Sequence, residues 1–120
     1  MFSSEQAEEP EVFNRQALLE RLGGDEEIFK EVIATFLEDA PHQLEKLKKA
    51  LQEGDATRVE RQAHLLKGAA LNIGGNGLQT AALELEVDGK DGDLNKAQSL
   101  VVNLDQEFEK LKEVLAGLAV

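Results

Sequence analysis

The residues of this 120-residue chain best suited to chemistry are His64 and Lys67, which lie three positions apart. A neutral imidazole nitrogen is a good nucleophile near pH 7 and can carry a transferred group. Residues three apart on a helix are neighbours, so the Lys67 ammonium can reach oxygen atoms of a group held by His64. An exposed helical histidine most often has no functional role when it stands alone. The residues around this pair therefore indicate whether His64 is functional.

The segment around His64 has the periodicity of a helix that lies on a hydrophobic core. At about 100° per residue, His64 lies roughly 140° and Gly68 roughly 180° around the helix from Val59. Both residues therefore point away from the core. A glycine inside a helix costs about 1 kcal/mol relative to alanine, and here it leaves one side of the imidazole accessible. The core-facing stripe consists of Val59, Ala63, Leu66, Ala70 and Ile73.

Five amphipathic segments separated by turn residues predict an all-α protein, and no segment alternates with the period typical of a strand. The segment after Asp25 keeps its apolar phase through Pro41, which favours one helix over two helices end to end. The four longer helices have short connections and predict an antiparallel up-down four-helix bundle with a short extra N-terminal helix. The expected helices cover residues 12–22, 26–53, 57–73, 76–88 and 94–118.

Polar residues before these segments predict how the helices begin. Thr57 and Glu60 have the spacing of a capping box at the start of the helix that contains His64. Residues 89–92 include two glycines and predict a polar turn before the last helix. Single N-cap residues are expected at Asn14, Asp25, Asn76 and Asp93.

Composition and charge exclude several classes of function. The formal net charge of −11 argues against binding nucleic acid, whose phosphates need a basic surface. The absence of cysteine excludes disulfides, thiol nucleophiles and thiolate metal sites. No apolar run approaches the length of a membrane span, and residues 1–5 lack a signal-peptide pattern. We expect a cytoplasmic protein with a flexible acidic tail at residues 1–11 and one domain at residues 12–120.

The motif His-x-Leu-Lys-Gly-Ala-Ala-x-Asn-Ile-Gly at residues 64–74 resembles the signature of histidine phosphotransfer (HPt) domains, the phosphocarriers of bacterial multistep phosphorelays. The resemblance extends from about residue 12 to the end of the chain. It implies that His64 accepts a phosphoryl group from a receiver-domain aspartyl phosphate and passes it to another receiver aspartate. It also implies that Lys67 stabilises the phosphoryl charge and that Gly68 gives the receiver steric access.

The resemblance also implies the partners and cofactors. The expected partners are response-regulator receiver domains and a sensor or hybrid histidine kinase, with the carrier itself a monomer. In this family the receiver supplies Mg²⁺, so the chain is expected to have no cofactor and no metal ligands of its own.

A docking surface for the receiver is expected around His64. Residues 57–73 contain three basic residues and one acidic residue, a net charge of +2 that would attract a receiver's acidic pocket. Exposed leucines beside a reactive histidine suggest a docking rim, although single exposed leucines are common on protein surfaces. The docking residues expected on these grounds are Glu60, Arg61, Leu65 and Leu71.

Two other functions remain open. The chain could be the HPt module of a larger hybrid or chemotaxis-type histidine kinase, or a helical scaffold in which His64 is unreactive. A self-contained kinase is disfavoured because no nucleotide-binding segment fits in the rest of the chain, so no ATP-dependent kinase activity is expected.

The residue that orients the His64 ring is not evident from the motif. Ala69 and Ala70 lie where many family members have a serine, so no hydroxyl is available there. A hydrogen bond to the ring must come from elsewhere, with Gln62 and Gln79 as candidates.

Overall fold

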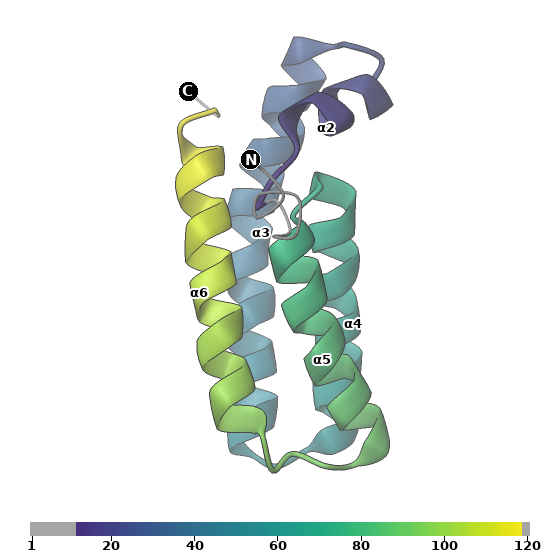
Figure 1. Ribbon diagram of the computed structural model, residues 1–120, viewed down its shortest axis with the longest axis vertical. Coiled ribbons are helices and arrows are strands. Elements are labelled where there is room, and N and C mark those ends of the chain that lie inside the picture. The colour runs from purple at the N-terminus through teal and green to yellow at the C-terminus, as the bar shows by residue number, and fades with distance from the viewer. Residues whose placement is uncertain (1–11, 119–120) are drawn as a thin grey trace, which may run out of the picture.

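The computed structural model describes residues 12–118 and contains only helices within that range. The tail expected at residues 1–11 and the final residues 119–120 lie outside the described residues. Four long helices run alternately up and down, and α2 lies across one end of them (Figure 1). The predicted four-helix bundle with a short extra N-terminal helix is confirmed. The helices are α2 (Arg15–Arg21), α3 (Glu26–Gln52), α4 (Ala56–Ile73), α5 (Asn76–Asp91) and α6 (Ala97–Ala116).

Helix α3 passes through Pro41 without a break, as its apolar phase predicts. Proline removes one backbone hydrogen bond and crowds the preceding turn. The buried side chains nevertheless stay in register across it, with Phe36 and Ala40 before the proline and Leu44 after it. Burial of this stripe in the core holds α3 together as one helix of 27 residues.

The predicted caps at Asn14 and Asp25 are confirmed, although α2 begins at residue 15 rather than residue 12. The predicted capping box at the start of α4 is wrong. Asp55 is the N-cap instead of Thr57, and its carboxylate accepts a hydrogen bond from the Arg58 backbone N–H at 3.1 Å. Aspartate is a stronger N-cap than threonine, so the helix begins as soon as the chain leaves the turn before it.

Two further predicted helix starts are displaced. Asp93 does not cap α6, because its carboxylate accepts from the Asn95 N–H at 3.0 Å and closes a separate turn. Helix α6 begins after Lys96, without a side-chain cap. Asn76 is the first residue of α5 rather than its cap, which is Gly75.

The turn predicted at residues 89–92 is wrong over most of its length, because α5 continues to residue 91 and ends at Gly92. Gly89 is buried inside the helix and faces α4. A Cβ atom at this position would lie 2.6 Å from the Glu60 backbone nitrogen and 2.9 Å from the Ala56 backbone oxygen. Gly89 therefore allows close packing of two helices rather than a turn.

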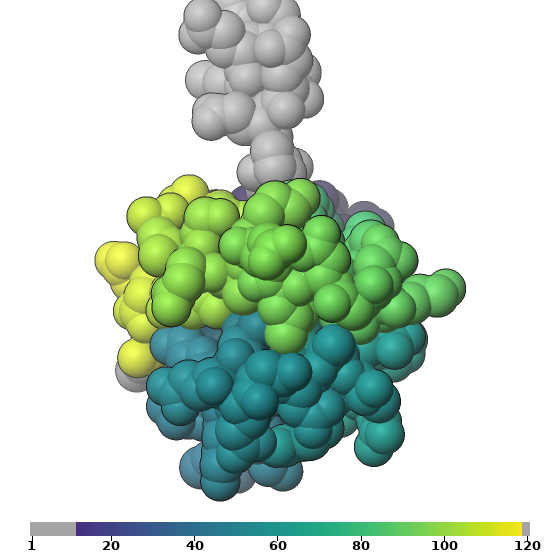
Figure 2. All heavy atoms as spheres, turned by 90° about the horizontal axis from the view of Figure 1, so that it is seen from below, coloured from purple at the N-terminus to yellow at the C-terminus, as the bar shows by residue number. Residues whose placement is uncertain are grey.

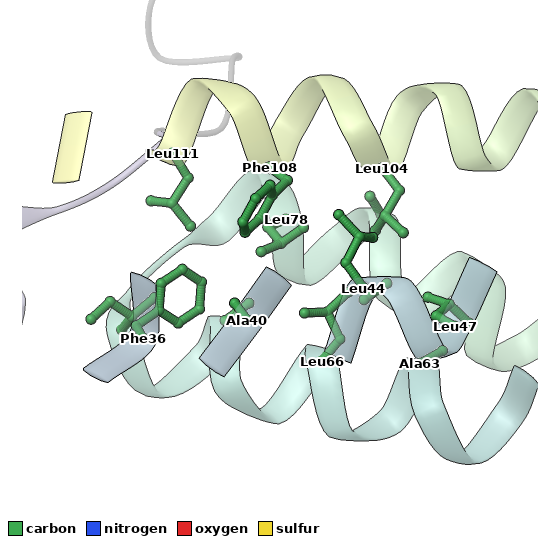
Figure 3. Close-up of a cluster of buried hydrophobic side chains, with 14 of the residues drawn as sticks. Phe36, Ala40, Leu44, Leu47, Ala63, Leu66, Leu78, Leu104, Phe108 and Leu111 are labelled. Carbon is green, nitrogen blue, oxygen red and sulfur yellow. The ribbon is translucent and has the colours of Figure 1, made fainter. Parts of the chain in front are cut away.

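The core lies between two layers of helices. Seen along the bundle axis, α3 and α4 (blue and teal) form one layer and α5 and α6 (green and yellow) form the other (Figure 2). Side chains from all four helices fill the space between them (Figure 3), and the rings of Phe36 and Phe108 lie 6.5 Å apart. The apolar side of α6 is buried through its middle and second half, at Leu104, Phe108, Leu111 and Leu115.

Helix α2 holds the C-terminal end of α4. Leu18 is buried in the shared core. The Arg21 guanidinium donates to the backbone oxygens of Leu71, at 3.4 Å, and of Asn72. These two carbonyl groups belong to the last turn of α4, where backbone acceptors have no partner within the helix. The contact fixes the end of the helix that carries His64.

Candidate functional site

Helix α4 holds its apolar stripe in the core and His64 on the surface. All five predicted stripe residues are buried, whereas 65% of the His64 side chain is exposed. The predicted orientation of the helix is therefore confirmed. The rigid core fixes the direction in which the imidazole leaves the helix, and solvent or a partner protein can approach it.

Glu86 of α5 joins His64 and Lys67 of α4 through a single carboxylate. Its Oε2 lies 2.7 Å from His64 Nδ1, and its Oε1 lies 2.7 Å from Lys67 Nζ. The carboxylate is mostly buried, with 17% of its side chain exposed. Neither Gln62 nor Gln79 forms a hydrogen bond with the ring in the described part of the chain. The residue that orients His64 is therefore Glu86, which was not predicted from the sequence.

The sequence does contain a signal for this contact. The turn at Gly74 and Gly75 joins α4 to α5, and His64 and Glu86 lie equally far from Gly75 along the chain. In an antiparallel helix pair, residues at equal distances from the turn come to the same level. The distance between the helices and their rotation decide whether the two side chains meet.

The electrostatics of the cluster determine which ring nitrogen is left free. Lys67, through its hydrogen bond and charge, lowers the pKa of Glu86 below its ordinary value, and His64 adds to this effect against the opposing effect of burial. Glu86 is therefore an ionised carboxylate near neutral pH. An ionised carboxylate only accepts hydrogen bonds, so Nδ1 of His64 carries the proton of this contact. The neutral ring then presents its free lone pair at Nε2.

Three of the four predicted docking residues are exposed, and the fourth is half-buried. Leu65 and Leu71 are 53% and 50% exposed, and Arg61 is also exposed. Glu60 is half-buried, between α4 and α5. A surface hollow of about 500 Å³ beside His64 is lined by Glu60, Arg61, Gln62, His64, Leu65 and Glu86. Three of the four predicted docking residues thus share one hollow with His64, and Leu71 is outside it.

Gly68 lies in a helix with nothing within 4 Å of the position that a Cβ would occupy. Replacement by alanine is therefore expected to stabilise the isolated protein by about 0.5–1 kcal/mol, because alanine is the better helix former. Chemical denaturation measures this gain. A loss of stability would contradict the open surroundings of this glycine. If its small size serves a partner, phosphoryl transfer with a receiver should slow in the same variant although the fold is stabilised.

The lowered pKa of Glu86 predicts a pH-dependent contribution to stability. Its folded-state pKa lies below the ordinary value of 4.5, so folding favours the ionised form. This contribution is complete above the ordinary pKa and is lost as the pH falls through the folded-state pKa. The difference in unfolding free energy between wild type and Glu86→Gln should therefore shrink as the pH falls from about 6 to about 3. A difference that stays constant over this range would contradict the assignment.

A helical bundle that presents an oriented, exposed histidine has the arrangement that a histidine phosphocarrier needs, and comparison with known proteins identifies the family. The Hpt domain family model matches residues 31–114. The chain therefore belongs to the Hpt domain family, and its function is histidine phosphotransfer in phosphorelay signalling. Among curated proteins, no match was found. No helix between residues 12 and 118 has both the length and the apolar content needed to cross a bilayer.

Two solved structures are similar to the chain. Histidine-containing phosphotransfer protein B (HptB) from Pseudomonas aeruginosa PAO1 is 27% identical and superposes with a TM-score of 0.83, over 91% of this chain and 95% of the other. The HPT domain of a sensor hybrid histidine kinase from Shewanella is 20% identical and superposes with a TM-score of 0.77, over 89% and 92% of the two chains. The second likeness supports the fold alone.

Proposed function

We propose that Nε2 of His64 is the phosphoacceptor, which takes a phosphoryl group from a receiver aspartyl phosphate and passes it to another receiver aspartate. The observation that carries this proposal is the contact between His64 Nδ1 and the Glu86 carboxylate. It holds the ring in one orientation and leaves the lone pair of Nε2 directed away from α5. The exposure of the ring gives a partner access to that atom.

The transfer step follows from this geometry. The Nε2 lone pair attacks phosphorus, the Nε2–P bond forms, and the P–O bond to the aspartate breaks. The aspartate leaves as a carboxylate, and Nδ1 keeps its proton. The ring gains positive charge in this step, and the adjacent Glu86 carboxylate stabilises it, as a carboxylate does beside an imidazole in hydrolases. Phosphoryl transfer depends chiefly on such positioning and charge stabilisation.

The other residues of the motif have supporting roles in the proposal. Lys67 lies where its charge can reach the phosphoryl oxygens in addition to pairing with Glu86, and Gly68 leaves space for the receiver. The exposed residues Arg61, Leu65 and Leu71 contact the receiver, with Glu60 at the edge of the hollow. Mg²⁺ belongs to the receiver, so the carrier contributes no metal ligand of its own.

The proposal also covers the setting in which the chain works. We infer a monomeric, cytoplasmic phosphocarrier without ATP-dependent kinase activity, whose partners are receiver domains and a hybrid histidine kinase. The same chemistry applies if the chain is the HPt module of a larger kinase. Family membership supports receiver domains and hybrid kinases as the class of partner.

Radiolabelled phospho-receivers test the proposal directly. Each purified receiver is labelled on its aspartate, mixed with the protein, and the products are separated by electrophoresis. Label that moves to this chain, is lost in acid and survives base is expected, because phosphohistidine has this stability and an aspartyl phosphate does not. A folded protein that takes no label from any receiver of the same organism would favour a helical scaffold instead.

Glu86→Ala is expected to slow transfer from a phospho-receiver by about 10- to 150-fold, the cost of one hydrogen bond to a charged group. Glu86→Gln keeps an acceptor without the charge and should fall between this variant and wild type. Nitrogen-15 NMR of His64 should show loss of the single Nδ1–H tautomer in the alanine variant. Glu84→Ala, an exposed glutamate of the same helix, is the control. Equal rates in all these variants would remove Glu86 from the mechanism.

A further inference from the structure

Lys67 is the cation of the motif nearest His64, and its positive charge is already neutralised. Lys67 Nζ forms an ion pair with Glu86 Oε1 at 2.7 Å, and 25% of the lysine side chain is exposed. The lysine and glutamate together carry no net charge. A phosphoryl group carries nearly two negative charges near neutral pH. To balance the charge of the phosphoryl group, the site needs a further cation. Otherwise Lys67 must leave Glu86 and release the carboxylate that orients the ring.

Arg61 is a cation close to His64 and free of such a pairing. Among residues 12–118 it forms no ion pair, and it lines the hollow beside the imidazole, whereas Lys67 does not. Arg58, the arginine one turn before Arg61 in the helix, is paired with Glu53 at 2.6 Å. Lys90 on α5 is exposed and also lies outside the lining of the hollow.

The helix places Arg61 beside His64, on the side opposite Lys67. Residues three apart differ by about 60° around a helix, so Lys67 and Arg61 flank His64 on opposite sides. Lys67 pairs with Glu86 of α5, and Arg61 lies about 120° from Lys67 around the helix. Their Cβ atoms lie about 5–6 Å from that of His64, within reach of a guanidinium. The space over Gly68, on the same side as Arg61, is open.

The negative charge of Glu60, another neighbour of His64, increases the need for a cation such as Arg61. Glu60 lines the same hollow, and its carboxylate would repel a phosphoryl group. A guanidinium binds phosphate oxygens through two parallel N–H donors, a geometry that lysine cannot provide. Arg61 can thus offset Glu60 and bind the phosphoryl group without disturbing the pair of Lys67 and Glu86.

We propose that Arg61 is the principal phosphoryl-binding cation of this carrier, and that Lys67 acts mainly by holding the Glu86 carboxylate against the His64 ring. This inference rests on the proposed role of His64. It assigns the guanidinium a contact with the transferred group itself, in addition to the docking role that its exposure predicts. Arg61 gains and loses no proton in the step. It stabilises the oxygens while the Nε2–P bond forms and the aspartyl P–O bond breaks.

The equilibrium of phosphate between a receiver and this protein tests the proposal. At protein concentrations well below those at which the complex forms, docking affects the rate of transfer but not the final partition of label. Arg61→Gln is expected to shift that partition about tenfold toward the receiver, the cost of one hydrogen bond to a charged group. Arg61→Lys should recover part of the shift, because it restores the charge without the paired donors.

Matched variants separate the possible results. Arg58→Gln removes the same charge one turn away and should leave the partition unchanged. Slower transfer with an unchanged partition in Arg61→Gln would make Arg61 a docking residue only and overturn the inference. A larger shift in Lys67→Gln or Lys90→Gln than in Arg61→Gln would also overturn it. Failure of wild type to take any label would refute the proposed function itself, which is a different outcome.

Discussion

His64→Gln is expected to abolish phosphoryl acceptance while leaving the bundle folded. A glutamine amide nitrogen is not a nucleophile, and no other described side chain is held so that a free imidazole nitrogen faces solvent. The fold should tolerate the change because 65% of the side chain is exposed and the core does not include it. Transfer of label from a phospho-receiver measures the first effect, and circular dichroism during thermal unfolding measures the second.

His42→Gln is the matched control for this loss. It removes the other histidine of the chain, which is exposed on α3 and forms no hydrogen bond within residues 12–118. Label should reach this variant at the wild-type rate. Label that persists on His64→Gln would place the phosphorylated residue elsewhere, and its loss from both variants would point to an indirect effect on the fold.

Gly89→Val is expected to cause a large loss of stability. The added Cβ would lie 2.6 Å from the Glu60 nitrogen and 3.0 Å from its Cα, which are backbone atoms of α4. Neither can move without separating the two helices. Overpacking of this kind should lower the free energy of unfolding by about 3 kcal/mol and the melting temperature by roughly 12–24 °C.

Gly89→Val should also disturb the contacts of His64 with Glu86. Glu86 lies one turn before Gly89, so separation of α4 from α5 draws its carboxylate away from His64 and Lys67. Slower phosphoryl transfer should therefore accompany the loss of stability, with weakened Nδ1–H protection in NMR spectra. Gly68→Ala provides the comparison, since the same kind of helical glycine there has open surroundings. Equal stability changes at the two glycines would contradict the packing argument.

Local patterns in the sequence were enough for most of the fold. The apolar phase of residues 59–73 predicts which side of α4 is buried, and it also places His64 on the surface. The unbroken phase through Pro41 predicts a single α3. These inferences succeed because helix periodicity and helix breakers act over a few residues. The errors occur at the helix ends, where Asp55 competes with Thr57 as the cap and Asp93 forms a turn of its own.

The motif and its spacing by themselves indicated the family, and they placed the histidine beside the neighbouring lysine, because these residues lie on one helical face within two turns. Only the tertiary structure decided what holds the histidine. Glu86 reaches it from another helix, at a distance set by the close approach of α4 and α5 at Gly89. The same packing pairs Lys67 with Glu86 and leaves Arg61 in the hollow. The distance and rotation between two helices depend on the packing of the whole core, so the local spacing of residues in the sequence does not predict them.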